Sequence, residues 1–337
     1  MKLNVLCYGV QEIERPIFES MNQDYQFNLS FTKELLNSNN AHRVKGFDAV
    51  ILFVNCKADA KNLNLLKDNG VKYIVTRTAG YNHIDLKEAK KLDYTIGYVP
   101  VYSPSAIATL AMTLGLSLLR KTSYMNYKSA NSNFNIDDHM FATEVKNCTI
   151  GIIGTGKIGL ETAKLWKAFG AKVIAYDPYE NSDAKLFLTY DTFDEIIAKS
   201  DLISLHTPYV AGKNDNLINN EVIMKMKPNS IIINTARGEL VDIKAVISAI
   251  KQDHLWGYAA DVLPNEELLI NRNLKNKNLK DFPEISELVN LYPRILISPH
   301  VAYFTDEAVK NMAVISFENL KQLYTTNTCN NAIKVLD

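Results

Sequence analysis

The stretch TIGIIGTGKIGLETAKLWKAFGAKVIAYDPY, residues 149–179, combines an apolar strand, a glycine-rich turn, a helix and a second strand. Its turn has the spacing Gly154-x-Gly156-x-x-Gly159, and Asp177 closes the second strand. In this context the first glycine permits a tight turn, the second lets the backbone approach a diphosphate, and the third lets the helix pack against the strand. The N-terminus of the helix then offers free N–H groups to an anion. The complete pattern predicts a dinucleotide-binding unit.

Asp177 also selects between the two nicotinamide dinucleotides. Its carboxylate can accept hydrogen bonds from both hydroxyls of the adenosine ribose. A 2′-phosphate would face a like charge at about 4 Å, which costs roughly 4 kcal/mol at an effective dielectric constant of 20. Pro178 and Tyr179 supply no cation that would offset this repulsion. The expected cofactor is therefore NAD.

Short β-rich runs alternate with helical patterns along most of the chain, which indicates parallel α/β sheets. A length of 337 residues corresponds to about two domains at roughly 150 residues each. A first series of strands lacks a glycine-rich turn, whereas a second series begins with one. The candidate strands are 4–8, 27–31, 49–54, 73–77 and 95–99, then 149–153, 172–177, 202–206, 230–234, 257–262 and 294–298.

The end of the chain predicts how the two domains are connected. The residues after His300 are too few for a domain, but they carry apolar side chains at helical spacing. Because chain ends often lie close together, this helix should return to the N-terminal domain. We expect two Rossmann-like or flavodoxin-like domains with a cleft between them. The NAD-binding domain, 102–299, is inserted into a discontinuous substrate domain, 1–101 plus 300–337; residues 121–147 fit neither pattern and are candidates for an arm or oligomer contact.

Composition excludes several classes of protein. The sums Lys+Arg and Asp+Glu are both 37, so the formal net charge is zero, which argues against a nucleic-acid or polybasic membrane partner. No run of 18 apolar residues predicts a membrane-spanning helix, and the start MKLNVLCYGV is typical of a first strand. The 4 cysteines form no Cys-x-x-Cys pair. A cytoplasmic protein without a metal site is expected.

Polar side chains follow several strands of the second series. His206, Arg237, Asp261 and His300 stand at or just past predicted strand ends, and Glu266 follows shortly after Asp261. Ligands of open α/β sheets bind beyond the carboxyl ends of the strands. A guanidinium buried there without an anionic partner would be costly, so an anionic ligand is expected near Arg237.

Reduction of a 2-oxo acid would use this set of groups. A cation binds the carboxylate and stabilises the charge that develops on the ketone oxygen, and histidine is a suitable acid near neutral pH. A carboxylate stabilises the imidazolium. Arg237, His300 and Glu266 are the candidates in that order, with Glu267 as a rival partner of the histidine, whereas His206 is expected to be structural.

Seven segments together resemble the D-2-hydroxyacid dehydrogenase family, and most of all its D-lactate dehydrogenase branch. They span almost the whole chain in the family's order. The segments are TRTAGYNHIDL (76–86), VPVYSPSAIA (99–108), GTGKIG with Asp177, LHTP (205–208), INTARGELVD (233–242), DVLPNE (261–266) and SPHVAYFTDEAV (298–309).

This resemblance implies roles for further residues. Arg237 binds substrate, Glu266 supports the histidine and His300 is the acid/base. The backbone amides of Ala79 and Gly80 hold the substrate carboxylate. Implied at the cofactor are Lys157 and Ile158 at the diphosphate, Thr207, Pro208, Thr235, Ala236 and Asp261 at the nicotinamide, and Asn214; Tyr102 is implied at the domain cleft near substrate and cofactor. A homodimer formed through the NAD-binding domain is also implied.

Two aromatic residues, Phe53 and Tyr303, are candidates for the substrate pocket. In the family an aromatic residue at the position of Phe53 accompanies small substrates, because a ring fills the room that a longer substrate would need. Pyruvate and D-lactate are therefore the expected pair. The alternatives are a branched-chain or aromatic D-2-hydroxyacid dehydrogenase, including the vancomycin-resistance type, and an NAD(H)-sensing binding protein; both residues also fit an ordinary core position.

Overall fold

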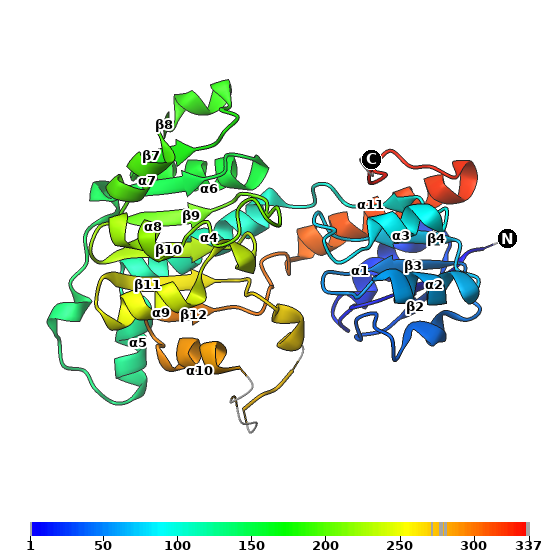
Figure 1. Cartoon of the computed structure of the whole chain (residues 1–337), viewed down its shortest axis with the longest axis horizontal. Coiled ribbons are helices and arrows are strands. Elements are labelled where there is room, and N and C mark those ends of the chain that lie inside the picture. The colour runs from blue at the N-terminus through cyan, green and yellow to red at the C-terminus, as the bar shows by residue number, and fades with distance from the viewer. Residues whose placement is uncertain (1, 271, 276–278, 280–281, 335–337) are drawn as a thin grey trace. The chain divides into compact units, whose positions relative to one another are not determined.

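The computed structural model describes residues 2–270, 272–275, 279 and 282–334, and the chain divides into two compact units (Figure 1). The first comprises Met1–Ser103 and Phe304–Asp337, and the second Pro104–Tyr303. Each contains a parallel sheet, which confirms the predicted α/β class. Residues 300–303 belong to the second unit rather than the first, as the sequence had suggested. The reason is that the backbone N–H groups of residues 300–302 donate to Asp261.

The first unit is built around a five-stranded parallel sheet of order β2-β1-β3-β4-β5. This is the flavodoxin-like strand order. The strands are short, and β3 is buried along its whole length because all of its side chains are apolar. The strands are β1 (Asn4–Cys7), β2 (Asn28–Phe31), β3 (Ala49–Leu52), β4 (Tyr73–Thr76) and β5 (Ile96–Gly97).

The helices of the first unit include the long C-terminal helix, as predicted. Its side chain Phe317 packs edge-on against Phe18, with ring centroids 5.9 Å apart. Beyond the helix, Ala332 bridges to Gly97 in β5, so the chain end is tied to the N-terminal sheet. The helices are α1 (Arg15–Met21), α2 (Ala60–Asp68), α3 (Leu86–Lys91) and α11 (Asp306–Thr326).

The second unit contains a seven-stranded parallel sheet of order β12-β11-β10-β9-β6-β7-β8. In chain order this is a Rossmann arrangement that reverses direction between β6 and β9. The short strand β8 was not predicted, because two residues carry no readable period. The strands are β6 (Thr149–Ile153), β7 (Lys172–Tyr176), β8 (Thr189–Tyr190), β9 (Leu202–Leu205), β10 (Ser230–Asn234), β11 (Leu255–Ala260) and β12 (Ile295–Ile297).

Helices of the second unit pack against this sheet. Helix α4 approaches α6 closely: a Cβ on Gly115 would lie 2.8 Å from the ring of Trp166, so glycine is required at this crossing. Residues 121–147, which the sequence left unassigned, contain α5 and short 3-10 turns. The helices are α4 (Pro104–Leu119), α5 (Thr122–Ala130), α6 (Lys157–Ala168), α7 (Phe193–Lys199), α8 (Asn220–Lys225), α9 (Ile243–Lys251) and α10 (Pro283–Asn290).

Candidate active site

The glycine-rich turn follows β6 at the point where the strand order reverses. Gly154 has φ +92°, and a Cβ there would lie 2.7 Å from the backbone of His206. A Cβ on Gly159 would lie 1.9 Å from the carbonyl oxygen of Gly154. In contrast, a Cβ on Gly156 would meet no heavy atom within 4 Å. The space beside Gly156 is therefore open where a diphosphate would approach the backbone.

Helix α6 begins directly after this turn. Gly156 occupies the N-cap position and offers no side-chain cap. The first N–H groups of the helix, including those of Lys157 and Ile158, have no intrahelical acceptor and carry partial positive charge. Lys157 is exposed and Ile158 half-buried, so this end of the helix is accessible to an anion.

Asp177, just past β7, is held in place by hydrogen bonds that leave part of its carboxylate free. Its Oδ2 accepts from the backbone N–H of Thr155 at 2.6 Å and from the Thr155 hydroxyl at 3.1 Å, and its Oδ1 accepts from the Tyr179 N–H at 2.8 Å. The Tyr190 hydroxyl donates to Thr155 Oγ1 at 2.9 Å. A carboxylate can accept about four hydrogen bonds, so acceptor positions remain for ribose hydroxyls. The sequence did not single out Thr155 or Tyr190.

The segments expected at the nicotinamide differ in how their polar groups are used. The Thr235 hydroxyl is buried and has no hydrogen-bond partner among the described residues, which fits a group that binds a ligand. The Ala236 N–H donates to Asn234 Oδ1 at 3.0 Å. Thr207 is half-buried and Pro208 exposed just past β9.

Asn214 uses its side-chain amide to brace its own loop. Its Nδ2 donates to the carbonyl oxygen of Pro208 at 2.8 Å, and its Oδ1 accepts from the Val210 N–H at 2.7 Å. This amide therefore shapes the loop after β9. Together with the open space at Gly156 and the orphaned Thr235 hydroxyl, the residues of this edge fit an NAD molecule.

Three neighbouring strands bring the expected reacting groups to the same edge of the sheet. In register, Asn234 of β10 pairs with Ala260 of β11, and Ala260 pairs with Ile297 of β12. Arg237, Asp261 and His300 follow these strand ends. Parallel strands end on the same side of a sheet, so all three follow one carboxyl edge.

His300 and Glu266 are in direct contact. His300 Nδ1 lies 2.5 Å from Glu266 Oε1, and both side chains are largely buried. Glu266 Oε2 also accepts from the backbone N–H of Leu263 at 3.2 Å. The carboxylate is thus anchored to its own loop while it orients the imidazole; the side chain of the rival Glu267 lies outside the part that the structure describes.

Asp261 organises the backbone around His300. This carboxylate is 1% exposed; it accepts from the Ser298 hydroxyl at 2.5 Å and from the N–H groups of Val301 and Ala302 at 2.9 Å. Burial raises the pKa of Asp261, and the hydrogen bonds from Ser298 oppose this rise. His300 itself has φ +54°, a conformation that non-glycine residues rarely adopt. Asp261 therefore supports the strained turn that presents the imidazole.

Arg237 has no acidic partner within ion-pair distance among the described residues. Its Nη1 donates to the carbonyl oxygen of Ala236 at 2.6 Å, and its own carbonyl oxygen accepts from Asn234 Nδ2 at 2.8 Å. The guanidinium is half-buried. A cation in this setting can still bind a carboxylate.

Gly238 brings the Arg237 turn against the loop that carries Glu266. A Cβ on Gly238 would lie 2.2 Å from the carbonyl carbon of Leu263 and 2.3 Å from the nitrogen of Pro264. No side chain fits in this contact. Gly238 was not predicted as a site residue; its place next to Arg237 in the sequence is the signal that could have identified it.

His206 is structural, as expected from the sequence. Its Nε2 lies 2.8 Å from the Ser204 hydroxyl. Burial lowers the pKa of His206 to about 3, so the imidazole is neutral at physiological pH and cannot act as a proton donor there.

The expected substrate-binding residues of the first unit follow β3 and β4. Ala79 is exposed and Gly80 half-buried, and their N–H groups donate to no acceptor among the described residues. Phe53 is 8% exposed. Tyr102 accepts through its carbonyl oxygen from Asn311 at 2.8 Å, whereas Tyr303 belongs to the second unit.

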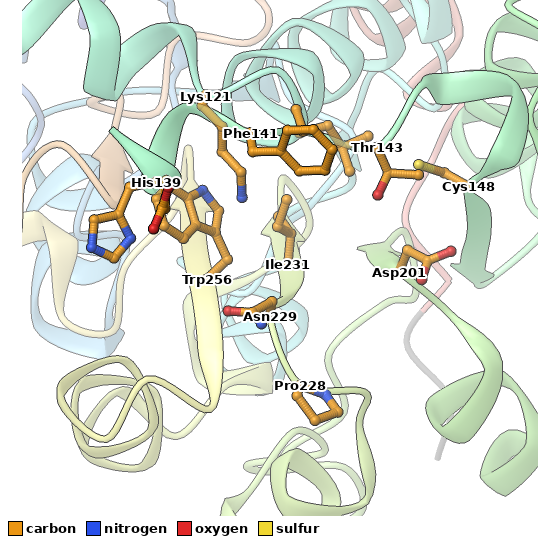
Figure 2. A pocket seen from close by; sticks show the side chains of 13 residues that line it. Lys121, His139, Phe141, Thr143, Cys148, Asp201, Pro228, Asn229, Ile231 and Trp256 are labelled. Atoms are coloured by element: carbon orange, nitrogen blue, oxygen red, sulfur yellow. The ribbon is translucent and has the colours of Figure 1, made fainter. Parts of the chain in front are cut away.

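Figure 2 shows a cavity of about 390 Å³ at the opposite edge of the second sheet. Cys148, Asp201 and Asn229, which precede β6, β9 and β10, line it together with Lys121 and Trp256. It contains none of the residues expected in the active site. No three His, Cys, Asp or Glu side chains in the described part of the chain are placed to hold a metal, and no described helix could cross a membrane.

Comparison with known proteins agrees with this geometry. Residues 112–302 match the model of the D-isomer specific 2-hydroxyacid dehydrogenase NAD binding domain. An aromatic 2-oxoacid reductase of Clostridium sporogenes is 35% identical, with 98% of each chain covered. A D-lactate dehydrogenase of Lactiplantibacillus plantarum is 35% identical over 98% of this chain and 99% of the relative. The NAD-complexed D-isomer specific 2-hydroxyacid dehydrogenase of Lactobacillus delbrueckii ssp. bulgaricus superimposes with a TM-score of 0.84 at 31% identity, covering 98% and 100%.

The Rossmann sheet, its glycine-rich turn and the paired His300 and Glu266 define an NAD-dependent oxidoreductase. NAD is the cofactor. The chain belongs to the family of D-isomer specific 2-hydroxyacid dehydrogenases.

Proposed function

We propose that this enzyme reduces small 2-oxo acids to D-2-hydroxy acids, with pyruvate and D-lactate as the preferred pair. The observation that carries the proposal is the 2.5 Å contact between His300 and Glu266 on the edge that also carries Arg237. A proton donor and a cation without an acidic partner are the groups that reduction of a 2-oxo acid requires.

His300 delivers the proton through one particular nitrogen. Because Nδ1 faces Glu266 at 2.5 Å, Nε2 is the atom left to protonate the ketone oxygen. Glu266 stabilises the imidazolium before transfer and holds the ring in one orientation. Bound NADH supplies the hydride. In the direction of oxidation, neutral His300 accepts the proton of the hydroxyl group.

Binding of the substrate carboxylate falls to Arg237 and to the N–H groups of Ala79 and Gly80. Arg237 also stabilises the charge that develops on the ketone oxygen. We assign the remaining expected positions as follows: Tyr102, Phe53 and Tyr303 to the substrate; Gly154, Gly156, Lys157, Ile158, Gly159, Asp177, Thr207, Pro208, Asn214, Thr235, Ala236 and Asp261 to the cofactor.

An aromatic 2-oxo acid is the second candidate substrate. The Clostridium sporogenes aromatic 2-oxoacid reductase is as similar in sequence as the Lactiplantibacillus plantarum D-lactate dehydrogenase, at 35% identity each. The bulk and burial of Phe53 favour the smaller substrate. A branched-chain specificity or the vancomycin-resistance type follows the same chemistry and differs in the pocket.

An NAD(H)-sensing binding protein is the alternative from another class. Such a protein would associate with a partner in an NADH-dependent manner without meaningful turnover. The complete set of Arg237, Glu266 and His300 favours the enzyme, because a sensor needs no proton donor.

We further propose that the enzyme acts in the cytoplasm as a homodimer. All four cysteines are free and buried, as suits a reducing compartment. Phe134, Ile136 and Phe141 are 77%, 90% and 87% exposed on the segment after α5, and such a group of exposed apolar side chains is typical of a protein interface. Light scattering would give the mass in solution, and a monomer at micromolar concentration would contradict the dimer.

The decisive experiment measures NADH consumption with a panel of 2-oxo acids. Pyruvate, 2-oxobutyrate, 2-oxoisocaproate and phenylpyruvate are compared by kcat/KM, and the product is resolved by chiral chromatography. We expect turnover to a D-2-hydroxy acid, fastest for pyruvate. A higher kcat/KM for phenylpyruvate would assign the aromatic specificity, and no turnover despite NADH binding would favour the sensor.

A further inference from the structure

Arg77, directly after β4, is a fully buried charge in the first unit. Its side chain is 0% exposed, and that of its partner Glu14 is 1% exposed. Arg77 Nη1 donates to Glu14 Oε1 at 2.8 Å, and Nη2 donates to the carbonyl oxygen of Gly9 at 2.7 Å. Glu14 Oε2 accepts from the Gln11 N–H at 2.7 Å. We call Arg77, Glu14 and Gly9 the Arg77 clamp.

Stability is a poor explanation for this ion pair. Two buried charges lose their hydration, and an apolar pair of similar volume is often as stable or more stable. The Nε of Arg77 is buried and has no hydrogen-bond partner among the described residues, so even the satisfaction of the guanidinium is incomplete. The pair is better explained by something that it positions.

The clamp holds the ring of Phe53. The guanidinium carbon of Arg77 lies 3.9 Å from the centre of this ring. On the Gly9 side, a Cβ would lie only 3.0 Å from Phe53 Cβ and Cδ1. The geometry follows from the sheet, because β1, β3 and β4 are neighbours and these three residues come shortly after their ends. Phe53 is therefore enclosed between the Gly9 backbone and the guanidinium.

The same arginine begins the loop whose amides are assigned to the substrate carboxylate. Its backbone N–H donates to the carbonyl oxygen of Leu52 at 3.0 Å, which extends the pairing of β3 and β4 by one residue. In the following turn, the Thr78 hydroxyl donates to the carbonyl oxygen of Gly80 at 2.7 Å. Arg77 thus connects the Phe53 ring to the loop with the free N–H groups of Ala79 and Gly80.

We propose that the Arg77 clamp is a specificity device that limits the size of the substrate by fixing Phe53 in one rotamer. Arg77 and Glu14 are positioning residues, because neither is placed in contact with substrate or cofactor. This inference rests on the proposed reduction of 2-oxo acids.

Loss of the clamp should widen the substrate range. Without the guanidinium and its partner, Phe53 regains rotamer freedom and yields room to a longer side chain. One or a few methylene groups in a pocket change specificity by on the order of tenfold or more. The ratio of kcat/KM for 2-oxoisocaproate to kcat/KM for pyruvate should therefore rise by about tenfold, mainly through KM.

The test is a double-mutant cycle. Glu14→Gln/Arg77→Met removes both charges together, so that no lone charge is left buried, and Phe53→Leu enlarges the pocket directly. Each should raise the specificity ratio. When all three substitutions are combined, the ratio should be no higher than for Phe53→Leu, because the clamp acts through Phe53; additive effects on the ratio would overturn the proposal.

The matched control is Glu34→Gln/Arg43→Met, which removes an exposed ion pair of the same type and the same first unit, 2.9 Å long. It should leave the ratio unchanged. Thermal unfolding confirms that each variant is folded. Should the double variant fail to fold, Arg77→Lys keeps the charge but removes the planar face above Phe53; an unchanged ratio in this folded variant would equally overturn the proposal.

The cycle separates this inference from the proposed function. If the unaltered enzyme turns over none of the 2-oxo acids, the proposed function fails. If it turns over pyruvate, and the folded clamp variants keep the same ratio and the same KM, the enzyme stands and the clamp is merely structural.

Discussion

At the scale of single residues, two carboxylates act on His300 through different atoms. Glu266 contacts the imidazole at Nδ1, whereas Asp261 accepts from the backbone N–H groups that directly follow His300. The first interaction controls charge and ring orientation, and the second controls the backbone that carries the ring. Reactivity here depends on both, because a proton donor must be charged and correctly placed at once.

Replacement of His300 by Ala should lower kcat for pyruvate reduction by about 10²–10⁴-fold, the usual contribution of a general acid. Glu266→Gln should lower kcat less, because the amide can still orient the ring but carries no charge. Titration of NADH fluorescence should give unchanged cofactor affinity for both. A Glu266→Gln enzyme with full kcat would contradict the role assigned to this carboxylate.

His206 predicts how the stability of the enzyme depends on pH. Burial lowers the pKa of His206 to about 3 from 6.5, so between these values the unfolded chain binds the proton and the folded chain does not. The free energy of unfolding should therefore fall as pH drops from about 6.5 towards 3. His206→Gln should reduce this loss in urea unfolding measured across the range. The control His42→Gln, at an exposed histidine, should retain the full loss.

At the scale of elements, turns rather than helices and strands position the reacting groups. The Arg237 turn after β10 and the loop after β11 touch through Gly238, where a Cβ would be 2.2 Å from the backbone of Leu263. The loop after β11 in turn carries Glu266. These contacts connect the cation to the partner of the proton donor.

Gly238→Ala should separate these two turns. The added methyl group meets backbone on both sides, and overpacking of this kind costs about 1–3 kcal/mol. We expect a lower midpoint of thermal unfolding and a loss of kcat/KM for pyruvate. Glu239→Ala changes the next, exposed residue and should have little effect on either; an active Gly238→Ala enzyme of unchanged stability would show that the turns can move apart freely.

Lys121, between α4 and α5, couples the cavity of Figure 2 to alkaline stability. Its Nζ lies 3.4 Å from the centre of the Trp256 ring, which favours the charged form. Burial and the charge of Arg294 outweigh this contact and lower the pKa of Lys121 to about 7 from 10.5. Between these values the unfolded chain binds more protons, so the free energy of unfolding should rise from pH 7 to 10.

Denaturant unfolding of Lys121→Met at several pH values would measure this effect. The variant should be more stable than the unaltered protein near pH 7, and its stability should rise less with pH. Lys167→Met, at an exposed lysine of α6, should keep the normal slope. Identical slopes for all three proteins would mean that Lys121 is not desolvated in solution.

At the scale of the whole molecule, the cofactor site and the reacting groups belong to one continuous stretch of chain. The second unit, Pro104–Tyr303, contains the glycine-rich turn, Asp177, Arg237, Glu266 and His300. The first unit is assembled from both ends of the chain and carries the expected substrate amides and Phe53.

Residues 104–303 produced by themselves should therefore bind NADH but reduce no pyruvate. Calorimetry would detect binding as a rise in the midpoint of unfolding with NADH concentration. Gly156→Val is the matched control: its side chain enters space that no described atom occupies, so the fold should persist while the diphosphate is blocked. Pyruvate reduction by the isolated unit would refute the assignment of the Ala79–Gly80 amides to substrate.

Much of this enzyme was readable from its sequence, because strands, helices and the glycine-rich turn depend on local patterns. The apolar run at 230–234 reads as a buried strand and is one, and the turn at Gly154 requires a glycine because its φ is positive. The expected reacting groups were likewise marked by their places after strand ends. The family resemblance added roles to those places.

Contacts between distant segments were decided only by the tertiary structure. Asp261 supports the His300 backbone, Gly238 packs against Leu263, and Arg77 pairs with Glu14 across 63 positions of the chain. No local pattern encodes such pairs, because they depend on which strands become neighbours in the sheets. The sequence by itself therefore determined the architecture and the chemistry at the strand ends, whereas the folded sheets decided which side chains hold those groups in place.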